Sequence, residues 1–208
     1  MIKTISENAS AELVIKKSKF IANIIPIHNE DEAKKYIEKI SKKYYDAKHN
    51  CYAYRLEENM ILERFSDNGE PNGTAGSPIL ELLKKQDINN ILVVVTRYFG
   101  GVLLGTGGLI RAYTDVTKKA LEKVKIVFGE KVVRYNVEVK YDKLKDVIYS
   151  CKKLEINVTN IDYKVNIMLT LESNEKKMEQ LLKSSRNIEK SMVTERNVYA
   201  YVENCRKK

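Results

Sequence analysis

The sequence predicts an α+β protein made of two domains, and three observations support that prediction. The chain has 208 residues, which allows one large domain or two small ones. All three prolines lie at or before Pro78, and eight of the nine glycines fall between Gly69 and Gly108. From Val133 onward, apolar residues recur instead at regular strand and helix spacings. We therefore expect a turn-rich domain over residues 1–127 and a regular domain over residues 131–205.

The first domain is expected to mix strands and helices. Its apolar runs predict two early strands, a helix, two more strands, a second helix, a buried strand and a long helix. The ranges are 11–16, 20–27, 30–44, 49–56, 60–65, a helix that holds Ile79, Leu82 and Leu83, then 91–98 and 109–124. This order is typical of a mixed sheet covered by helices.

The second domain has the clearest periodicity. Alternation of apolar and polar residues predicts strands with one buried face, and helical spacing predicts two helices between them. The ranges are 133–141, 144–154, 156–158, 163–171, a helix with Met178, Leu181 and Leu182, and 198–202. Asp142 is a candidate cap for the first of these helices. The order βαββαβ is the ferredoxin-like arrangement, with one sheet and two helices on one face.

The charge balance of the chain is basic. Lysine and arginine number 37 against 28 aspartate and glutamate residues, which gives a formal net charge of +9 and a pI near 9.2. A basic surface attracts polyanions because binding releases their counterions, so RNA, DNA or the ribosome is a candidate partner. The alternative is the mildly basic, solvated surface of a lysine-rich protein.

The sequence predicts a cytoplasmic protein with no membrane attachment. A spanning helix needs about 20 apolar residues, and no such run is present. The segment MIKTISENASAELVIKK also lacks the pattern of a signal peptide. Cys51, Cys151 and Cys205 are far apart without a C-x-x-C pair, and His28 and His49 are the only histidines. We expect free thiols in a reducing compartment, and neither a metal nor a cofactor.

The segment TRYFGGVLLGTGGLIRAY, from Thr96 to Tyr113, holds the first candidate site. A buried strand ends in a glycine-rich loop that enters a helix, where free backbone N–H groups and the helix dipole attract anions. Two arginines add charge-assisted donors for phosphate. The candidate residues are Arg97, Gly100, Gly101, Gly105, Thr106, Gly107, Gly108 and Arg111. No lysine precedes a Ser or Thr as in a Walker loop, so ATP hydrolysis is not expected.

A purely structural role for this segment is the competing interpretation. The glycines would then permit positive φ angles and close packing of the helix against the strand. One of the arginines would be the structural partner of Asp67, Glu70 or Asp115.

The segment FSDNGEPNGTAGSPI, from Phe65 to Ile79, is the second candidate loop. Its candidate residues are Asp67, Gly69, Glu70, Gly73, Thr74 and Gly76. Asp67 and Glu70 have the chemistry of an acid–base or metal-binding pair but no histidine beside them, and an ordered turn capped by Thr74 is the favoured alternative. We expect the two glycine-rich segments to lie side by side and to form one concave surface.

His49 and Cys51 stand two residues apart in HNCYAY, so on a strand they face the same way. A cysteine nucleophile needs an activating base and an orienting group, and spacing along one strand does not supply both. A buried thiol beside a hydrogen-bonded histidine is favoured over a peptide hydrolase that uses Cys51 or a metal.

The glycine-rich motifs resemble the signature of the IMPACT/YigZ family. The matching stretches are GSPILELL, VVVTRYFGG, SDNGEPNGTAG and AKHNCYAY, all within residues 1–127. The resemblance implies a first domain with the β-α-β fold of a small-subunit ribosomal protein and of elongation factor G. It implies a second domain like the last, ferredoxin-like domain of that factor. The βαββαβ order of the second domain follows from its periodicity as well.

The resemblance also bears on function. Eukaryotic members of the family regulate translation by binding the activator of the amino-acid-starvation kinase, which restrains phosphorylation of an initiation factor. Those members have a different accessory domain at the other end, so this partner does not transfer to the present chain. No catalytic residues transfer either.

Two functions from different classes follow from these observations. The first is a non-enzymatic regulatory protein that contacts RNA, the ribosome or a translation factor through a glycine-rich, anion-binding surface. The alternative is an enzyme that acts on a phosphorylated or nucleotide ligand, with Asp67 and Glu70 opposite the Gly105–Gly108 loop. The sequence leaves the oligomeric state open.

Overall fold

The computed structural model describes residues 2–57, 60–184 and 187–202 of the chain. The described residues form two compact units. One consists of the chain up to Phe128 together with Tyr201 and Val202, and the other spans Gly129–Ala200. Each unit has its own apolar core. None of the described helices is both long and apolar enough to cross a membrane.

The first unit is built on a five-stranded antiparallel sheet with the order β2-β3-β6-β4-β5. Its strands are β2 (Ala9–Ile15), β3 (Ser18–Pro26), β4 (His49–Glu57), β5 (Ile61–Ser66) and β6 (Ile91–Tyr98). The central strand β6 is almost entirely buried because it is covered on both faces, which explains its unbroken apolar run.

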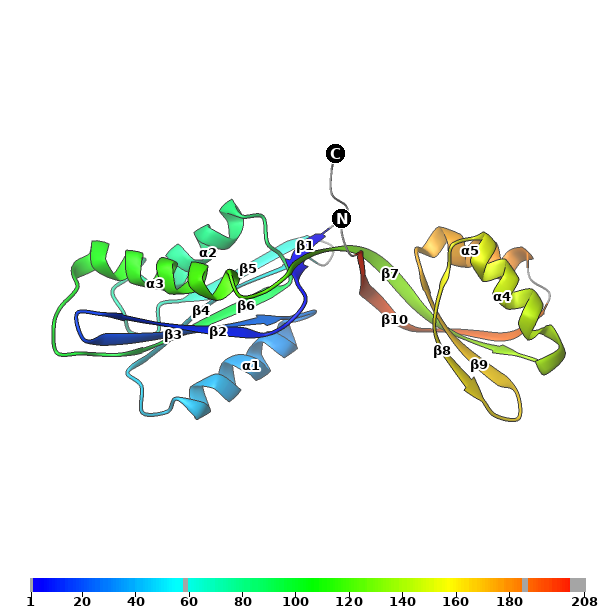
Figure 1. Cartoon of the computed structure of the whole chain (residues 1–208), viewed down its shortest axis with the longest axis horizontal. Helices are drawn as coiled ribbons and strands as arrows, with labels where there is room; N and C mark the ends of the chain where they lie inside the picture. Colours follow the sequence, from blue (N-terminus) through cyan, green and yellow to red (C-terminus); the bar gives the residue numbers. More distant parts are fainter. Residues whose placement is uncertain (1, 58–59, 185–186, 203–208) are drawn as a thin grey trace. The chain divides into compact units, whose positions relative to one another are not determined.

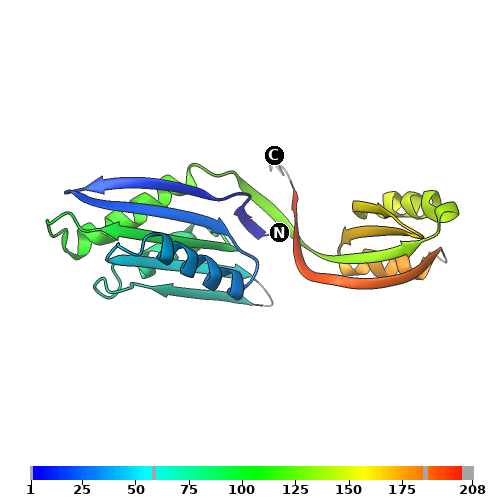
Figure 2. The same ribbon diagram turned by 90° about the horizontal axis from the view of Figure 1, so that it is seen from below.

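Helices cover both faces of this sheet, as Figures 1 and 2 show. The helix α1 (Glu30–Lys43) packs on one face, while α2 (Gly76–Lys85) and α3 (Gly105–Leu121) pack on the other. Alternate residues of each strand therefore enter different cores. Ala22, Ile24, Val93 and Val95 face α3, whereas Ile25, Leu92 and Val94 lie in the core beneath α1.

The three helices of the first unit begin in different ways. Asn29 caps α1 by accepting a hydrogen bond from the Glu32 amide at 2.8 Å, and acidic residues fill its first turn. The start of α2 is capped by Asp67 from the preceding loop. The predicted cap Thr74 was wrong, because its hydroxyl donates to the Pro71 carbonyl at 2.7 Å. The start of α3 has neither a side-chain cap nor an acid.

The second unit has the ferredoxin-like order that the sequence predicts. Its elements are β7 (Ile126–Val139), η1 (Tyr141–Lys143), α4 (Leu144–Lys153), β8 (Asn157–Tyr163), β9 (Ile167–Ser173), α5 (Glu175–Ser184) and β10 (Ile188–Val202). In its sheet β7 pairs with β9 and β10, and β9 pairs with β8; β1 (Ile2–Ile5), a strand of the first unit, also pairs with β7. The strand order β10-β7-β9-β8 confirms the βαββαβ prediction.

Several element boundaries differ from the sequence-based expectations. The strand predicted over 163–171 corresponds to β9 but starts later, at Ile167, because Tyr163 ends β8 and Val165, 94% exposed, lies in the turn between the two strands. Asp142 does not cap α4, because it lies in the short 3-10 helix before it. The helix α3 starts at Gly105 rather than 109, since a glycine-rich first turn has no apolar stripe to reveal it. Strand β1 was not expected. The predictions that concern residues 203–205, Cys205 included, fall outside the described residues.

Candidate functional site

The two glycine-rich segments line one pocket of about 460 Å³ in the first unit, which we call the glycine pocket. Its lining consists of Lys48, His49, Gly69, Glu70, Pro71, Arg97, Phe99, Leu103, Leu104, Gly105, Thr106 and Leu109. The pocket thus brings together the start of β4, the loop before α2, the end of β6 and the start of α3. The expected side-by-side placement of the two segments is what the structure shows, and the volume is typical of a ligand pocket.

Arg97 does not offer its charge to the pocket, because it is paired inside the fold. Its guanidinium donates from Nη1 to Glu70 Oε1 at 2.7 Å, and the two side chains are only 6% and 3% exposed. The guanidinium also lies over the rings of Phe20 and Phe99, 5.4 and 5.5 Å from their centroids. Arg97 therefore fits the role of a structural partner of Glu70 better than the role of a residue that is free to bind phosphate. Its Nε is buried without a partner among the described residues.

Glu70 also accepts a hydrogen bond from the Tyr113 hydroxyl at 2.8 Å, which ties α3 to the loop before α2. The Cys51 thiol lies 3.4 Å from that hydroxyl and 2.9 Å from the Asp67 carbonyl oxygen. Burial raises the pKa of Cys51 to about 12, and it also raises the pKa of Tyr113. A thiol with such a pKa is protonated at neutral pH, so this environment is that of a structural cysteine.

Asp67 is engaged by backbone amides. Its Oδ2 accepts from Gly73 N at 2.8 Å, and its Oδ1 accepts from Ala75 N at 2.9 Å and Gly76 N at 2.8 Å. These bonds satisfy amides at the start of α2 and place a negative charge at the positive end of its dipole. Both carboxylates of the second loop therefore hold the fold, which gives them a structural role in place of the acid–base role considered from the sequence.

The start of α3 is the part of the pocket that remains open to an anion. Gly101 and Gly105 have φ angles of +82° and +71°, which let the chain turn sharply into the helix. Leu104, which precedes the helix, makes no side-chain cap hydrogen bond, and among the described residues no group outside α3 accepts from the amides of Gly105–Gly108. Thr106 is exposed at this first turn and lines the pocket. Lys48, also exposed and lining the pocket, has no ion-pair partner among the described residues.

His49 adds a polar edge to the same pocket. The ring is 8% exposed, and its Nδ1–H donates to the Asn68 carbonyl at 2.8 Å. Because a carbonyl only accepts, this contact assigns the proton to Nδ1 and leaves Nε2 without a partner among the described residues. Nε2 accepts a hydrogen bond when the ring is neutral and donates one when it is protonated.

The glycines named from the sequence fall into separate roles. A Cβ at Gly100 would lie 2.0 Å from the Lys17 carbonyl carbon, and one at Gly76 would lie 2.6 Å from Ser66 O, so both permit close backbone contacts. Gly69 and Gly73 have φ angles of +82° and +75°. Gly107 and Gly108 are helical residues of α3. Arg111 is exposed and does not line the glycine pocket.

Some pocket residues were missed by sequence reasoning. Lys48 belongs to the motif AKHNCYAY and directly precedes His49, but it was not among the predicted site residues. Leu103, 83% exposed, and Phe99, 47% exposed, form an apolar rim that breaks the polar pattern expected of a surface loop. Tyr113 gave no signal, because its contact with Glu70 joins residues 43 positions apart.

The fold and the pocket define a class of protein with two α+β units and a partly apolar pocket in the first unit. The candidate nucleophile Cys51 and the carboxylates of Asp67 and Glu70 make hydrogen bonds within the fold. No group of three or more metal-ligating side chains is found within residues 2–57, 60–184 and 187–202.

Comparisons with known proteins identify the family. A family model described as the Impact N-terminal domain matches residues 16–121. The IMPACT family member YvyE of Bacillus subtilis is 38% identical over 164 residues, which is 79% of this chain and 76% of YvyE. The IMPACT family member YigZ of Escherichia coli is 33% identical over 157 residues, 74% of this chain and 77% of YigZ. The chain therefore belongs to the IMPACT family.

A solved structure extends the likeness to the second unit. The crystal structure of a hypothetical protein covers 93% of this chain and 97% of its own, with 28% identity and a TM-score of 0.65. The fold of both units is thus one that a related chain also adopts.

Proposed function

We propose that this chain is a non-enzymatic binding protein that regulates translation, and that it contacts RNA, the ribosome or a translation factor through the glycine pocket. The regulatory part of the proposal is supported by family membership, since the resemblance implies translation regulation for eukaryotic members. Because translation takes place in the cytoplasm, the proposal implies that location. The binding part rests on the geometry of the pocket.

The observation that carries the proposal is the uncapped start of α3. Its first turn has neither a side-chain cap nor an acid, and among the described residues it receives no carboxylate such as the one that Asp67 gives to α2; Gly105 and Thr106 place it in the pocket wall. Free amides and the positive end of a 17-residue helix bind phosphate oxygens well. Lys48 supplies a further donor beside it, and the exposed Phe99 offers a ring on which a base can stack.

The test adds a negative charge where phosphate is expected. Thr106→Glu places a carboxylate in the first turn of α3, which repels a bound phosphate but stabilises the helix by about 0.3–1 kcal/mol. We expect affinity for ribosomes or short RNA, measured by filter binding over a salt series, to fall by at least about tenfold. The thermal midpoint should stay equal or rise.

A matched control separates this site from the general basic charge. Asn160→Asp makes the same charge change on an exposed position of β8 in the second unit, which does not line the pocket, and should leave affinity almost unchanged. Equal affinity of the Thr106→Glu and Asn160→Asp proteins would refute the pocket as the contact surface. Lys48→Gln should lower both the affinity and its salt slope, because one phosphate contact is lost.

An enzyme that acts on a phosphorylated or nucleotide ligand remains the second candidate, because a pocket of about 460 Å³ accepts a ligand of that size. The engagement of Asp67 with amides and of Glu70 with Arg97 and Tyr113 favours binding over acid–base catalysis. Incubation with a nucleoside triphosphate and with a phosphomonoester distinguishes the two candidates. Turnover that Thr106→Glu abolishes and Asn160→Asp retains would favour the enzyme.

A further inference from the structure

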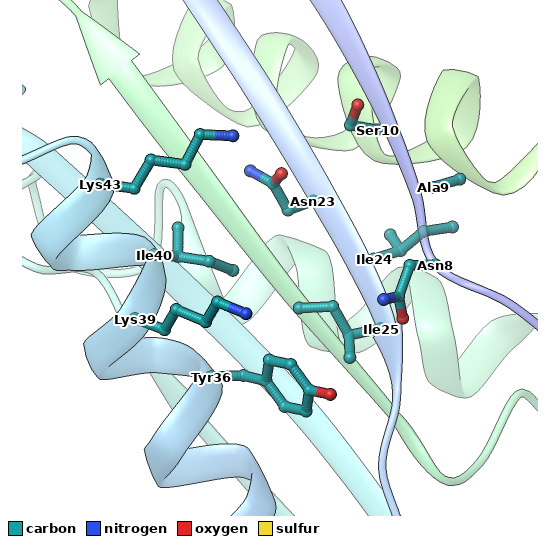
Figure 3. A pocket seen from close by; sticks show the side chains of 10 residues that line it. All are labelled: Asn8, Ala9, Ser10, Asn23, Ile24, Ile25, Tyr36, Lys39, Ile40 and Lys43. Atoms are coloured by element: carbon teal, nitrogen blue, oxygen red, sulfur yellow. The ribbon is translucent and has the colours of Figure 1, made fainter.

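A second pocket of the first unit lies between α1 and the β2–β3 edge of the sheet, and Figure 3 shows it from close by. We call it the α1 groove. It has a volume of about 410 Å³ and is lined by Asn8, Ala9, Ser10, Asn23, Ile24, Ile25, Tyr36, Lys39, Ile40 and Lys43. None of these residues belongs to the glycine-rich segments, so the α1 groove is separate from the site of the proposed function.

The groove exists because α1 covers only part of its face of the sheet. The helix packs on β4 and β6, and its stripe of Ala33, Tyr36, Ile37 and Ile40 closes the core there. On this face of the sheet, α1 does not cover the edge strand β2 or the part of β3 next to it, whereas α3 packs on both strands on the opposite face. Tyr36, Lys39 and Lys43 lie on consecutive turns of α1 and border this opening, as helical spacing requires.

The lysines of α1 differ in whether an acid neutralises them. Lys34 pairs with Glu30 at 3.6 Å and Lys42 pairs with Glu38 at 2.6 Å, each four residues apart on the helix. Lys39 and Lys43 line the groove and have no acidic partner among the described residues. Their ammonium groups lie over aromatic rings instead, 6.0 Å from the Tyr36 centroid and 5.0 Å from that of Tyr44.

The groove also contains a buried donor without an acceptor. Asn23 Nδ2 is inaccessible to solvent and has no hydrogen-bond partner among the described residues. Figure 3 shows the Asn23 amide and the Lys43 ammonium pointing toward each other. Two donors that face each other satisfy neither group, because a hydrogen bond needs an acceptor between them. An anionic oxygen supplies that acceptor.

No acid of the neighbouring strand neutralises this arrangement. Glu12 lies on the same face of β2 as Ser10, which pairs with Asn23 across the sheet. Its carboxylate is already paired with Lys19 at 2.9 Å. The groove therefore presents two ammonium groups, one amide donor and the Ser10 hydroxyl, against an apolar wall that includes Ile25, Ile40 and the Tyr36 ring.

We infer that the α1 groove binds the phosphate group of a nucleotide, with Lys39, Lys43 and Asn23 around the phosphate and the Tyr36 ring beside the nucleoside. Two cations and a neutral donor match the charge of a phosphate ester better than that of a single carboxylate. The Tyr36 ring and the isoleucine side chains of the wall suit the flat nucleobase of such a ligand. The same phosphate chemistry occurs in a free mononucleotide and in a single RNA strand.

The test compares two double variants of the same helix in the full chain. Lys39→Met with Lys43→Met removes the two charges that line the groove and keeps an unbranched apolar side chain at each position. Lys34→Met with Lys42→Met makes the same change in net charge on lysines that do not line the groove. Binding of adenosine monophosphate and of an eight-residue single-stranded RNA is measured by calorimetry for both variants.

We expect the groove variant to lose at least tenfold in affinity for one or both probes, while the control variant stays close to the parent protein. The probe whose affinity falls identifies the source of the phosphate. Equal affinities of the two variants for both probes, or failure of the parent to bind either at millimolar concentration, would overturn the inference. Thr106→Glu tests the glycine pocket separately, so each site can fail alone.

Asn23→Val provides an independent measurement. It removes the unpartnered donor without changing the charge, and valine suits the position in β3. If Asn23 contacts the phosphate, the affinity of this variant for the responsive probe falls severalfold while its thermal midpoint does not drop. Undiminished affinity would remove Asn23 from the site and refute the three-residue arrangement.

Discussion

The glycine pocket and the α1 groove show opposite uses of charged side chains within one unit. In the glycine pocket, the lining residues Arg97 and Glu70 neutralise each other, and Asp67 in the loop before α2 accepts from backbone amides. In the α1 groove, Lys39 and Lys43 have no acid, and Asn23 Nδ2 has no acceptor among the described residues.

The contrast between the two pockets shows that a charged residue in a motif is no evidence for a ligand until its partners are known. The glycine pocket keeps backbone donors for a ligand and uses its arginine for stability. The α1 groove has side-chain donors that the fold leaves unsatisfied. Substitutions in the two regions should therefore differ in the sign of their effect on stability.

The largest expected effect on stability belongs to Arg97. Arg97→Met leaves Glu70 buried without its cation, and breaking a buried pair from one side costs about 3–5 kcal/mol. Urea unfolding of the first unit should show a much lower midpoint. Lys42→Met breaks an exposed pair and should cost less than about 1 kcal/mol. Similar losses in the two variants would contradict the structural role of Arg97.

Cys51 should be almost unreactive in the folded protein. Its pKa is raised from an ordinary 9.0 to about 12 because burial disfavours the thiolate. Each pKa unit lowers the thiolate fraction tenfold, so at pH 8 that fraction falls about a thousandfold relative to an unperturbed thiol. Alkylation followed by mass spectrometry of peptides measures the rate with and without urea. Rapid alkylation of Cys51 in the native chain would contradict the structural role of this thiol and would favour a nucleophilic role.

Substitution of Asp67 should lower stability by less than substitution of Arg97 does. Asp67→Ala removes the acceptor of the Gly73, Ala75 and Gly76 amides, and loss of a helix cap costs about 0.5–2 kcal/mol. The thermal midpoint should fall accordingly. Asp115→Ala makes the same charge change at a side chain that is 53% exposed on α3, and its midpoint should move little. An Asp67→Ala protein as stable as the parent would show that the amides find other acceptors.

Substitution of Asn23 should have the smallest effect on stability, and it should raise stability rather than lower it. Asn23→Val removes an unsatisfied buried donor and should stabilise the first unit by about 1 kcal/mol. Asn50→Val is the matched control, because Asn50 accepts from Thr96 Oγ1 at 2.6 Å and donates to Tyr44 O at 3.4 Å. Thermal unfolding should show the Asn50 variant less stable than the parent. A destabilised Asn23 variant would mean that its amide is satisfied in solution.

Local pattern was sufficient for much of the fold. The apolar run Ile91–Tyr98 identified the buried strand β6, and the spacing of Ala33, Ile37 and Ile40 identified α1. Errors occurred where the apolar signal was weak or continuous across a turn. The glycines at the start of α3 hid its first turn, and the alternation through Val165 concealed the hairpin between β8 and β9.

The α+β class, the ferredoxin-like order of the second unit and the choice of the glycine-rich segments as a candidate site could all be predicted from the order of the amino acids alone. These follow from periodicity and turn chemistry, which act over a few residues. The partners of the polar side chains became known from the folded chain: Arg97 pairs with Glu70 across 27 positions, Tyr113 donates to the same carboxylate, and no described residue bonds to Asn23 Nδ2. Whether a charge is free for a ligand depends on groups distant in sequence, because pairing and burial are properties of the folded chain.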